Sequence, residues 1–597
     1  MTKKIKEKTK KFSVILIKPS AYDEDGYVVR FKKGVLPSNT LACLYGLTQE
    51  VIENDSLGED IEIIAKIYDE VVDLIDIDIL SNEVNAVSKD SVFCMVGVQT
   101  HQFPRASEIA RLLRKKGHQV MMGGFHISGV LSVQGKPSTE LQKMLDIGVS
   151  LTAGEVEEKW VSLLKDAYNK KLKPVYNFLK DKPELETPHL PQVNREYLDK
   201  FSVDSFSTLD CGRGCPFKCS FCTVINVHGN LMRHRPIYNL KKHVMHNFED
   251  NGVTFYFFTD DNFSRNKRWS EIFDALIDLR QNGYNFTFMM QVDMMSYKIP
   301  NFMEKAVKAG CTQVFMGMES INPENLIEIG KKQNKIETYR EMINAWRSRG
   351  VMTHVGYIIG FTNDTYKSIK KDIKTLAYDI HVDMASFFIL TPLPGSKDHT
   401  QMLDDAVVMR SDLNWFDTFH PVVKHPKMSE KEWLKAYNYA WEKFYSLRRM
   451  QWILKSLKGE PLRNMYWTFL WYKYSIVVCK NHPMVSGFHR LKDRKNRRPE
   501  YKIENVFRFF LRRTKDWIIE IALFIRIFFE FLYLYIRNMF RFHLQTESHI
   551  NRLSKKAKKT IQSLKETAGS MADKAGEISK AAESLTSEER RKFKHKA

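Results

Sequence analysis

The sequence predicts an α/β protein: a doubly wound parallel sheet, a second parallel α/β unit, and an α-helical C-terminal region. Short apolar runs alternate with amphipathic stretches of helical spacing, which is the pattern of buried parallel strands joined by crossover helices. A first series of runs lies at 13–19, 61–68, 91–99, 119–124 and 149–153. A second series lies at 204–209, 253–259, 285–292, 312–318, 353–359 and 384–390. Beyond residue 400 the alternation is lost.

These patterns predict seven segments. They are a basic tail at 1–12, the first α/β domain at 13–170, a Pro-rich linker at 171–200, the second α/β domain at 201–400, an aromatic and basic helical cap at 401–516, an amphipathic apolar helix at 517–545, and a Lys/Ala/Glu-rich flexible tail at 546–597.

Composition narrows the cellular setting. The chain has 597 residues, a hydrophobic fraction of 43% and eight cysteines, four of them within one twelve-residue stretch. That clustering does not suit a disulfide framework and favours a reducing cytoplasm. The basic N-terminus lacks the long apolar segment of a secretory signal. A net charge of +21 favours an acidic neighbour, which can be nucleic acid, an anionic membrane face or the polyanions of the cytosol.

The four clustered cysteines are the main chemical motif. Cys215, Cys219 and Cys222 have the spacing C-x3-C-x2-C in a Gly/Pro-containing loop that follows an apolar run. Three thiolates can hold a 4Fe–4S cluster and leave one iron open. A structural zinc site is the alternative, and it needs a fourth ligand from Cys211, His228 or His234. We expect Cys211 to be a bystander near the cluster.

This motif, with Phe221 just before the last cysteine, resembles the signature of the radical S-adenosylmethionine (radical SAM) enzymes. The resemblance implies that the open iron binds S-adenosylmethionine and that one electron cleaves it to a 5′-deoxyadenosyl radical. It implies a partial (β/α)6 barrel for residues 201–400, with its chemistry at the carboxyl ends of the strands. It also implies an electron donor such as ferredoxin or flavodoxin.

The same resemblance assigns the S-adenosylmethionine site to strand ends of the second series. Asp260 and Asp261 replace the usual Gly-Gly-Glu motif, and a helix N-cap is their alternative role. The residues expected at this site are Phe221, Thr259, Asp260, Asp261, Gln291, Glu319, Ser320, Ile359 and Gly360. No catalytic residue is assigned. Cys311 is expected in the core.

The first domain resembles the cobalamin-binding domain that precedes many radical SAM enzymes. The matching positions, and the expected cobalamin contacts, are Thr100, Gly123, Gly124 and Gly154. The loop that usually carries the cobalt-binding histidine, in an Asp-x-His-x-x-Gly motif, here reads Tyr22-Asp-Glu-Asp-Gly26 and has none. The alternatives are cobalamin bound without that ligand and a domain that only packs on the barrel. His126 is expected to be structural.

The C-terminal region suggests a membrane surface. Residues 490–516 hold eleven Lys/Arg against four Asp/Glu, and the apolar helix at 517–545 follows. Arg526, Glu530, Arg537 and Arg541 share one face of that helix and disfavour a spanning segment. The three alternatives are attachment to the anionic inner face of the membrane, an internal packing or dimer helix, and a span.

These expectations combine into one function. The chain resembles cobalamin-type radical SAM proteins, a group that includes hopanoid methylases and the anaerobic magnesium-protoporphyrin ester cyclase. We expect a radical SAM enzyme that modifies an unactivated C–H bond, by methylation, coupling or oxidative rearrangement, in a hydrophobic, lipid-like substrate. It is expected to be cytoplasmic and peripheral on the inner face of the membrane. The alternatives are modification of RNA or protein, and a scaffold that binds metal or cobalamin without catalysis.

Overall fold

The computed structural model describes residues 8–185, 191–203, 205–331, 334 and 336–543. By its internal contacts the chain divides into two units, of which the first holds residues 1–450 and 469–528 and contains both α/β domains. The predicted tail at 546–597 lies outside the described residues.

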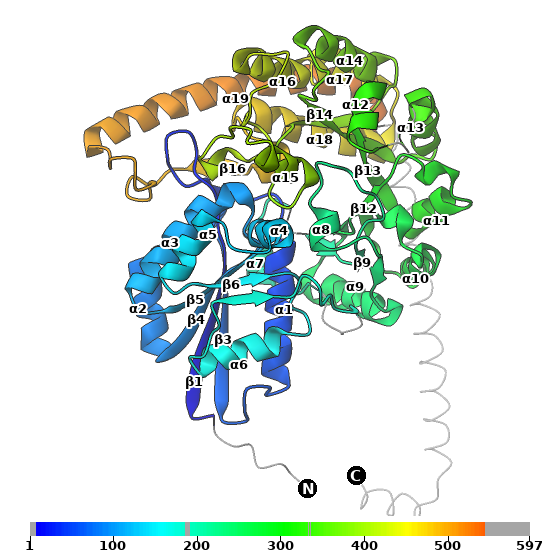
Figure 1. Ribbon diagram of the computed structural model, residues 1–597. Helices are drawn as coiled ribbons and strands as arrows, with labels where there is room; N and C mark the ends of the chain where they lie inside the picture. Colours follow the sequence, from blue (N-terminus) through cyan, green and yellow to red (C-terminus); the bar gives the residue numbers. More distant parts are fainter. Residues whose placement is uncertain (1–7, 186–190, 204, 332–333, 335, 544–597) are drawn as a thin grey trace, which may run out of the picture. The chain divides into compact units, whose positions relative to one another are not determined.

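The first domain is a six-stranded sheet with the order β3-β1-β4-β5-β6-β7, and every strand pair in it is parallel. Its strands are β1 (Lys10–Lys18), β3 (Ile61–Asp69), β4 (Asp90–Met95), β5 (Gln119–Gly123), β6 (Ser150–Ala153) and β7 (Val175–Asn177). Its helices are α1 (Asn39–Glu53), α2 (Ile77–Val87), α3 (Phe103–Lys115), α4 (Phe125–Gln134), α5 (Thr139–Asp146) and α6 (Trp160–Tyr168), and a 3₁₀ turn η1 (Thr100–Gln102) precedes α3. In Figure 1, α2 and α3 lie on one side of the sheet and α1 and α6 on the other. The predicted doubly wound sheet is confirmed.

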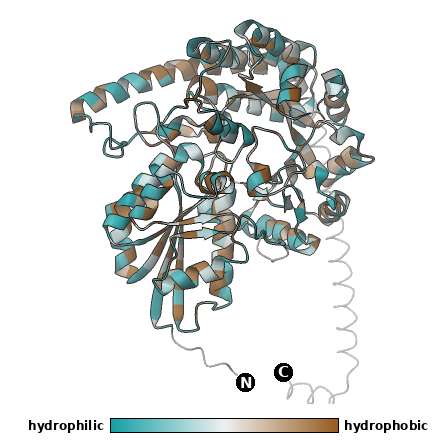
Figure 2. Cartoon of the chain, in the orientation of Figure 1, coloured by the Kyte–Doolittle hydropathy of each residue, from teal (hydrophilic) through white to brown (hydrophobic). Residues whose placement is uncertain are grey.

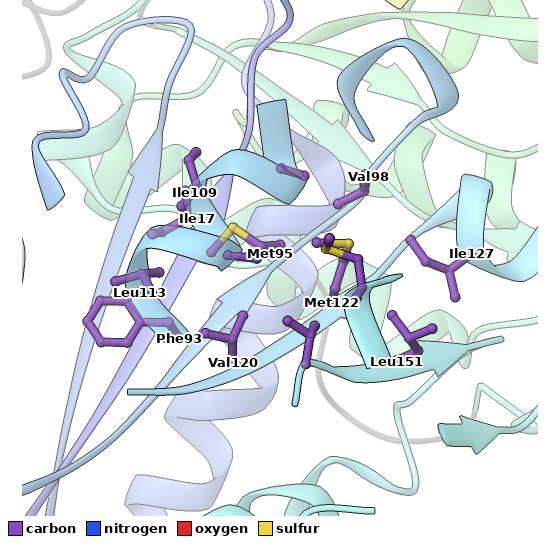
Figure 3. Close-up of a cluster of buried hydrophobic side chains, with 14 of the residues drawn as sticks. Ile17, Phe93, Met95, Val98, Ile109, Leu113, Val120, Met122, Ile127 and Leu151 are labelled. Atoms are coloured by element: carbon purple, nitrogen blue, oxygen red, sulfur yellow. The ribbon is translucent and has the colours of Figure 1, made fainter. Parts of the chain in front are cut away.

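The core of this domain lies between the sheet and the helices. Figure 3 shows Ile17, Phe93 and Met95 from the strands near Ile109 and Leu113 from α3. All five side chains are almost fully buried. The apolar runs read from the sequence therefore form the interior of the sheet.

The second domain is a six-stranded parallel sheet in the order β15-β14-β13-β12-β11-β8. Its strands are β8 (Phe206–Leu209), β11 (Phe255–Phe258), β12 (Thr287–Val292), β13 (Cys311–Glu319), β14 (Met352–Ile359) and β15 (Met384–Ile389). Its helices are α8 (Val224–Val227), α9 (Ile237–Asn251), α10 (Trp269–Gln281), α11 (Phe302–Ala309), α12 (Pro323–Glu328), α13 (Tyr339–Arg347) and α14 (Tyr366–Tyr378). Each of these strands is followed in the chain by at least one helix, so the predicted βα series is confirmed. Cys311 is buried at the start of β13, as expected.

The C-terminal region is largely helical. Its elements are α15 (Lys397–Asp404), η5 (Leu413–Trp415), α16 (Glu430–Phe444), α17 (Leu447–Lys455), α18 (Gly459–Val477), β16 (Phe488–Leu491) and α19 (Val506–His543). The helix predicted at 517–545 begins eleven residues earlier in the structure, at Val506. No helix in the described part of the chain is long and apolar enough to cross a membrane.

The basic stretch 490–516 departs from its predicted place in a separate cap. Strand β16 pairs antiparallel with β2 (Arg30–Lys33) of the first domain. Arg490 and Lys492 form ion pairs with Asp23, and Arg498 pairs with Asp412. These cations neutralise acidic groups of the chain itself, which reduces the free positive charge that they offer to a membrane.

Candidate functional site

The cysteine loop leaves β8 at its carboxyl end, as parallel-barrel sites require. Cys215, Cys219 and Cys222 are free, half-buried thiols. Gly214, with φ of +105°, allows the turn into the loop, since a Cβ there would lie 2.3 Å from the Leu231 carbonyl oxygen. Two backbone hydrogen bonds hold the loop: Cys222 N donates to Cys219 O at 3.1 Å, and Cys215 N donates to Gly229 O at 3.2 Å. The backbone of the loop is therefore ordered around its three thiols.

The three thiols are close enough to influence one another. The pKa of Cys222 is raised to about 12, mainly by burial, and the charges of Cys219 and Cys215 contribute to this rise. Among the described residues, no three His, Cys, Asp or Glu side chains are arranged to hold a metal ion. The assignment of these cysteines as cluster ligands stays a prediction.

Asp260 and Asp261 support the cysteine loop from the end of β11. Asp260 is fully buried, and its carboxylate accepts the backbone N–H of Cys211 at 3.0 Å. Asp261 accepts the N–H of Gly214 at 2.9 Å and pairs with His228 Nδ1 at 3.0 Å. Burial and the nearby Asp210 carboxylate raise the pKa of Asp260 well above its ordinary value. Neither carboxylate is a helix N-cap, and their role toward S-adenosylmethionine stays a prediction.

The other residues predicted at this site lie at strand ends, with different partners. Gln291 donates to the Asp260 carbonyl at 3.1 Å, and Ser320 is buried and accepts from Asn325 at 3.3 Å. Phe221 packs against the small apolar cluster that contains Ile358.

The close approach of the Trp433 ring requires glycine at position 360. Gly360 has φ of +109°, and a Cβ there would lie 2.1 Å from the Trp433 ring. The indole N–H of Trp433 donates to the Ile359 carbonyl at 3.0 Å. The predicted adenine-contacting end of β14 is therefore closed on one side by α16.

Sequence reasoning missed Lys331. Its ammonium group bonds to Glu319 and to the Gly317 carbonyl, the latter at 2.8 Å, and it lies near Cys219. Burial disfavours the charged ammonium, but the Glu319 carboxylate outweighs this effect and raises the pKa of Lys331. A buried cation beside the thiols can balance the negative charge of a thiolate cluster. The Lys-Lys pair after Gly330 was its only signal in the sequence.

A cavity of about 920 Å3 lies at the carboxyl edge of the first sheet. Its walls include Ser20–Asp25 after β1 and Gly97 and Gln99 after β4. These adjacent strands mark the point where the strand order reverses, the usual ligand site of an open α/β sheet. The far wall includes His228, Thr259 and Asp261 of the barrel. The cavity therefore connects the first sheet to the cysteine loop.

The residues predicted to contact cobalamin divide into two groups. Gly123, Gly124 and Gly154 line the cavity, but Thr100 does not. Thr100 is buried, with its hydroxyl 3.4 Å from His126 Nδ1, and its contact with cobalamin stays a prediction. Gly124 is required by the fold itself, because a Cβ there would lie 2.2 Å from Val98 N. His126 is buried, as expected of a structural histidine.

Three histidines that sequence reasoning did not assign to this cavity line its walls: His101, His228 and His420. His228 Nδ1 pairs with Asp261 at 3.0 Å, and His420 Nδ1 pairs with Asp417 at 2.8 Å. Burial lowers the pKa of His101 to about 4. Imidazoles held by carboxylates are typical ligands of transition metals. The volume of the cavity and these donors fit a large metal-containing cofactor such as cobalamin.

A buried ion network joins the cavity to the cysteine loop. Arg213, two residues before Cys215, pairs with Glu155 at 2.8 Å and with Asp210 at 2.7 Å. Arg233 also pairs with Glu155, at 2.6 Å. Glu155 follows β6 of the first domain, so the network links the two domains. Lys218, by contrast, is exposed.

Residues 209–376, from the end of β8 through most of α14, match the radical SAM superfamily. This part of the chain is therefore a radical SAM domain. The chain is a radical SAM enzyme, a class whose cofactors are a 4Fe–4S cluster and S-adenosylmethionine.

Two relatives and one solved structure show how far the similarity of this radical SAM enzyme extends. Bacteriochlorophyllide d C-8(2)-methyltransferase of Chlorobaculum tepidum is 27% identical over 377 residues, 60% of this chain and 80% of the relative. Hopanoid C-2 methylase of Rhodopseudomonas palustris is 22% identical over 177 residues, 28% of this chain and 34% of the relative.

The structural match extends over two thirds of the chain. The radical SAM methyltransferase TsrM of Kitasatospora setae, solved with cobalamin and a [4Fe–4S] cluster bound, has a TM-score of 0.50 at 14% identity, over 67% of this chain and 79% of TsrM. This match supports the arrangement of a Rossmann-like domain followed by a radical SAM barrel. The resemblance to cobalamin-type radical SAM proteins and the predicted fold class are confirmed.

Proposed function

We propose that this radical SAM enzyme methylates an unactivated carbon of a hydrophobic substrate with cobalamin as the methyl carrier. The observation that carries the proposal is the single cavity that extends from the switch point of the first sheet to His228, Thr259 and Asp261 at the barrel mouth. One continuous cavity then serves both the carrier and the site of hydrogen abstraction. The methyltransferase relatives support the reaction type.

Different residues of the chain hold the cluster, balance its charge and fix the cysteine loop. Cys215, Cys219 and Cys222 hold the cluster, and Lys331 offsets its negative charge. When bound, the cluster supplies the electron that cleaves S-adenosylmethionine, and cobalamin supplies the methyl group. Asp260 and Asp261 fix the cysteine loop through the N–H groups of Cys211 and Gly214.

The distribution of buried charge supports a water-poor cavity wall. Arg213 and Glu155 neutralise each other, with side chains 12% and 5% exposed. A radical site needs water and competing hydrogen donors excluded. A network that satisfies its own charges holds the two domains together without drawing water between them.

We infer a hydrophobic substrate from the surface of α19. Figure 2 shows hydrophobic residues along this helix. Those of its first part that are exposed include Val506, Phe507, Phe510, Leu511, Trp517, Ile518, Ile521, Phe524, Ile525 and Phe528. Such a face marks an interaction site. Because Ile519 and Leu523 of the same helix line the cavity, one helix separates that space from the apolar surface.

A lipid bilayer is the occupant that best fits this face. Arg508 and Lys515 of α19 are exposed near this face, and such cations suit anionic lipid. The hopanoid methylase among the relatives supports a lipid-like substrate. We therefore propose peripheral attachment to the cytoplasmic face of the membrane, with ferredoxin or flavodoxin as electron donor.

Anaerobic reconstitution tests the chemistry. The full chain is loaded with iron, sulfide and cobalamin, reduced, and assayed for 5′-deoxyadenosine release. Cys219→Ala is expected to lose both the bound cluster and this product. The matched control is Cys311→Ala, because Cys311 is buried at the opposite end of its strand. Zinc in place of iron, or full product release by Cys219→Ala, overturns the proposal.

Flotation with vesicles of phosphatidylglycerol and phosphatidylcholine tests the attachment. Ile521→Ser combined with Phe528→Ser is expected to reduce the floated fraction at least several-fold, because these side chains are 59% and 53% exposed on one helix face. Ile79→Ser combined with Val408→Ser removes similarly exposed apolar groups elsewhere and is expected to change nothing. If the wild type does not float but forms a dimer, and the first double variant is a monomer, the face is assigned to a second copy of the chain instead.

A further inference from the structure

A loop from beyond the barrel reaches the cobalamin-like domain. The 3₁₀ turn η5 brings Asn414 against Tyr22, and the Asn414 amide accepts from Tyr22 N at 3.0 Å and donates to Tyr22 O at 2.9 Å. These two bonds join the loop after β15 to the loop after β1. Five residues of this loop thereby line the cavity at the switch point: Asn414, Trp415, Asp417, Phe419 and His420.

This loop carries a histidine that is held for coordination. His420 Nδ1 lies 2.8 Å from the Asp417 carboxylate, whose other oxygen accepts the backbone N–H groups of Phe419 and His420. The second ring nitrogen, Nε2, lies 3.6 Å from Glu24, beyond an ordinary hydrogen bond. The Glu24 side chain is 80% exposed, so this contact is easily replaced. An imidazole fixed through one nitrogen leaves the other free for a metal.

We propose that His420 ligates the cobalt of cobalamin from the side of the first domain. The inference rests on the proposed binding of cobalamin in this cavity. The loop after β1 contains no histidine, and His420 lies beside Glu24 of that loop. A residue about 400 positions later in the chain thus supplies the missing ligand in space.

The other two cavity histidines suit this role less well. His228 belongs to the barrel, and its Asp261 partner also accepts the N–H of Gly214 in the cysteine loop. His101 lies in the field of the Asp417 carboxylate, but that group already pairs with His420 Nδ1. His420 therefore combines a carboxylate partner with a place beside the loop after β1.

Electron paramagnetic resonance of Co(II) tests the ligand directly. The full chain is produced with uniform 15N labelling, loaded with natural-abundance cobalamin and reduced to the Co(II) state. A 15N ligand from the protein splits each cobalt line into a doublet, whereas the 14N base of the cofactor gives a triplet. We expect a doublet in the wild type, in His101→Ala and in His228→Ala, and its loss in His420→Ala.

Rescue separates a missing ligand from a misfolded site. Natural-abundance imidazole added to labelled His420→Ala is expected to restore the splitting as a triplet. A triplet or unsplit lines in the wild type, or a doublet that persists in His420→Ala, overturns the inference while cobalamin binding stands. Failure of the wild type to bind cobalamin overturns both this inference and the proposed methyl carrier.

Discussion

Asp210 is the residue whose neutralisation most directly tests the ion network beneath the cysteine loop. It follows β8, and its side chain is 1% exposed. One carboxylate oxygen accepts from Arg213 at 2.7 Å and from Arg235 at 2.9 Å. Burial disfavours its charge, but the two guanidinium groups outweigh burial and hold the pKa of Asp210 well below its ordinary value.

Asp210→Asn keeps the shape and removes the charge. Breaking one partner of a buried ion pair costs ~3–5 kcal/mol, because the remaining charge is left without compensation. Arg213 keeps Glu155 in the variant, so we expect the lower end, ~3 kcal/mol, in the free energy of unfolding. The group has a lowered folded-state pKa, so its contribution is present above about pH 4 and is lost as the pH falls through the folded value.

Urea denaturation at neutral pH measures this cost. The control is Asp274→Asn, because Asp274 pairs with Lys305 at 2.8 Å with side chains 59% and 30% exposed. An exposed pair of this kind contributes at most ~1 kcal/mol. If the two variants unfold at the same urea concentration, or if the difference grows in acid, the reasoning about buried charge is refuted.

Three further predictions follow from packing and burial. Gly129→Ala is expected to lower the melting temperature by several degrees in calorimetry, because the added Cβ would lie 2.1 Å from the Pro394 carbonyl oxygen. The control is Gly117→Ala: a Cβ there would lie in open space, so the only destabilisation is the backbone strain of alanine at φ of +86°. Burial raises the pKa of Asp372 to about 6, so its stabilising protonation is lost as the pH rises through 6; Asp372→Asn is expected to raise stability at pH 7.5 and not at pH 4 in urea titrations. Lys331→Met leaves the Glu319 carboxylate without its cation, and calorimetric titration is expected to show at least tenfold weaker S-adenosylmethionine binding.

The sequence was sufficient to predict the two parallel sheets because the signal is local. Each buried strand is a short apolar run bounded by turn residues, and the runs at 61–68 and 353–359 match β3 and β14 within one residue at each end. The cysteine triad was predictable for the same reason, since its spacing lies within eight residues. Local patterns need no knowledge of the partner segment.

Orientation and distant pairing could not be predicted in this way. Asp260 and Asp261 were placed at the correct strand end, but their contacts with Cys211 and Gly214 depend on how a separate loop folds back. Thr100 has the expected position in the chain, yet its side chain faces the domain interior. The partner of Lys331 is twelve residues away, across a turn, and no periodicity records that contact.

The pairing of β16 with β2 has a consequence for biogenesis. A ribosome releases residues 30–33 long before it has made residues 488–491, so this edge of the first domain waits unpaired while more than 450 residues are synthesised. Contacts of such high sequence separation form late and slowly. The cavity wall, which includes Arg490 of β16, is therefore expected to be completed only after the C-terminal segment has been synthesised.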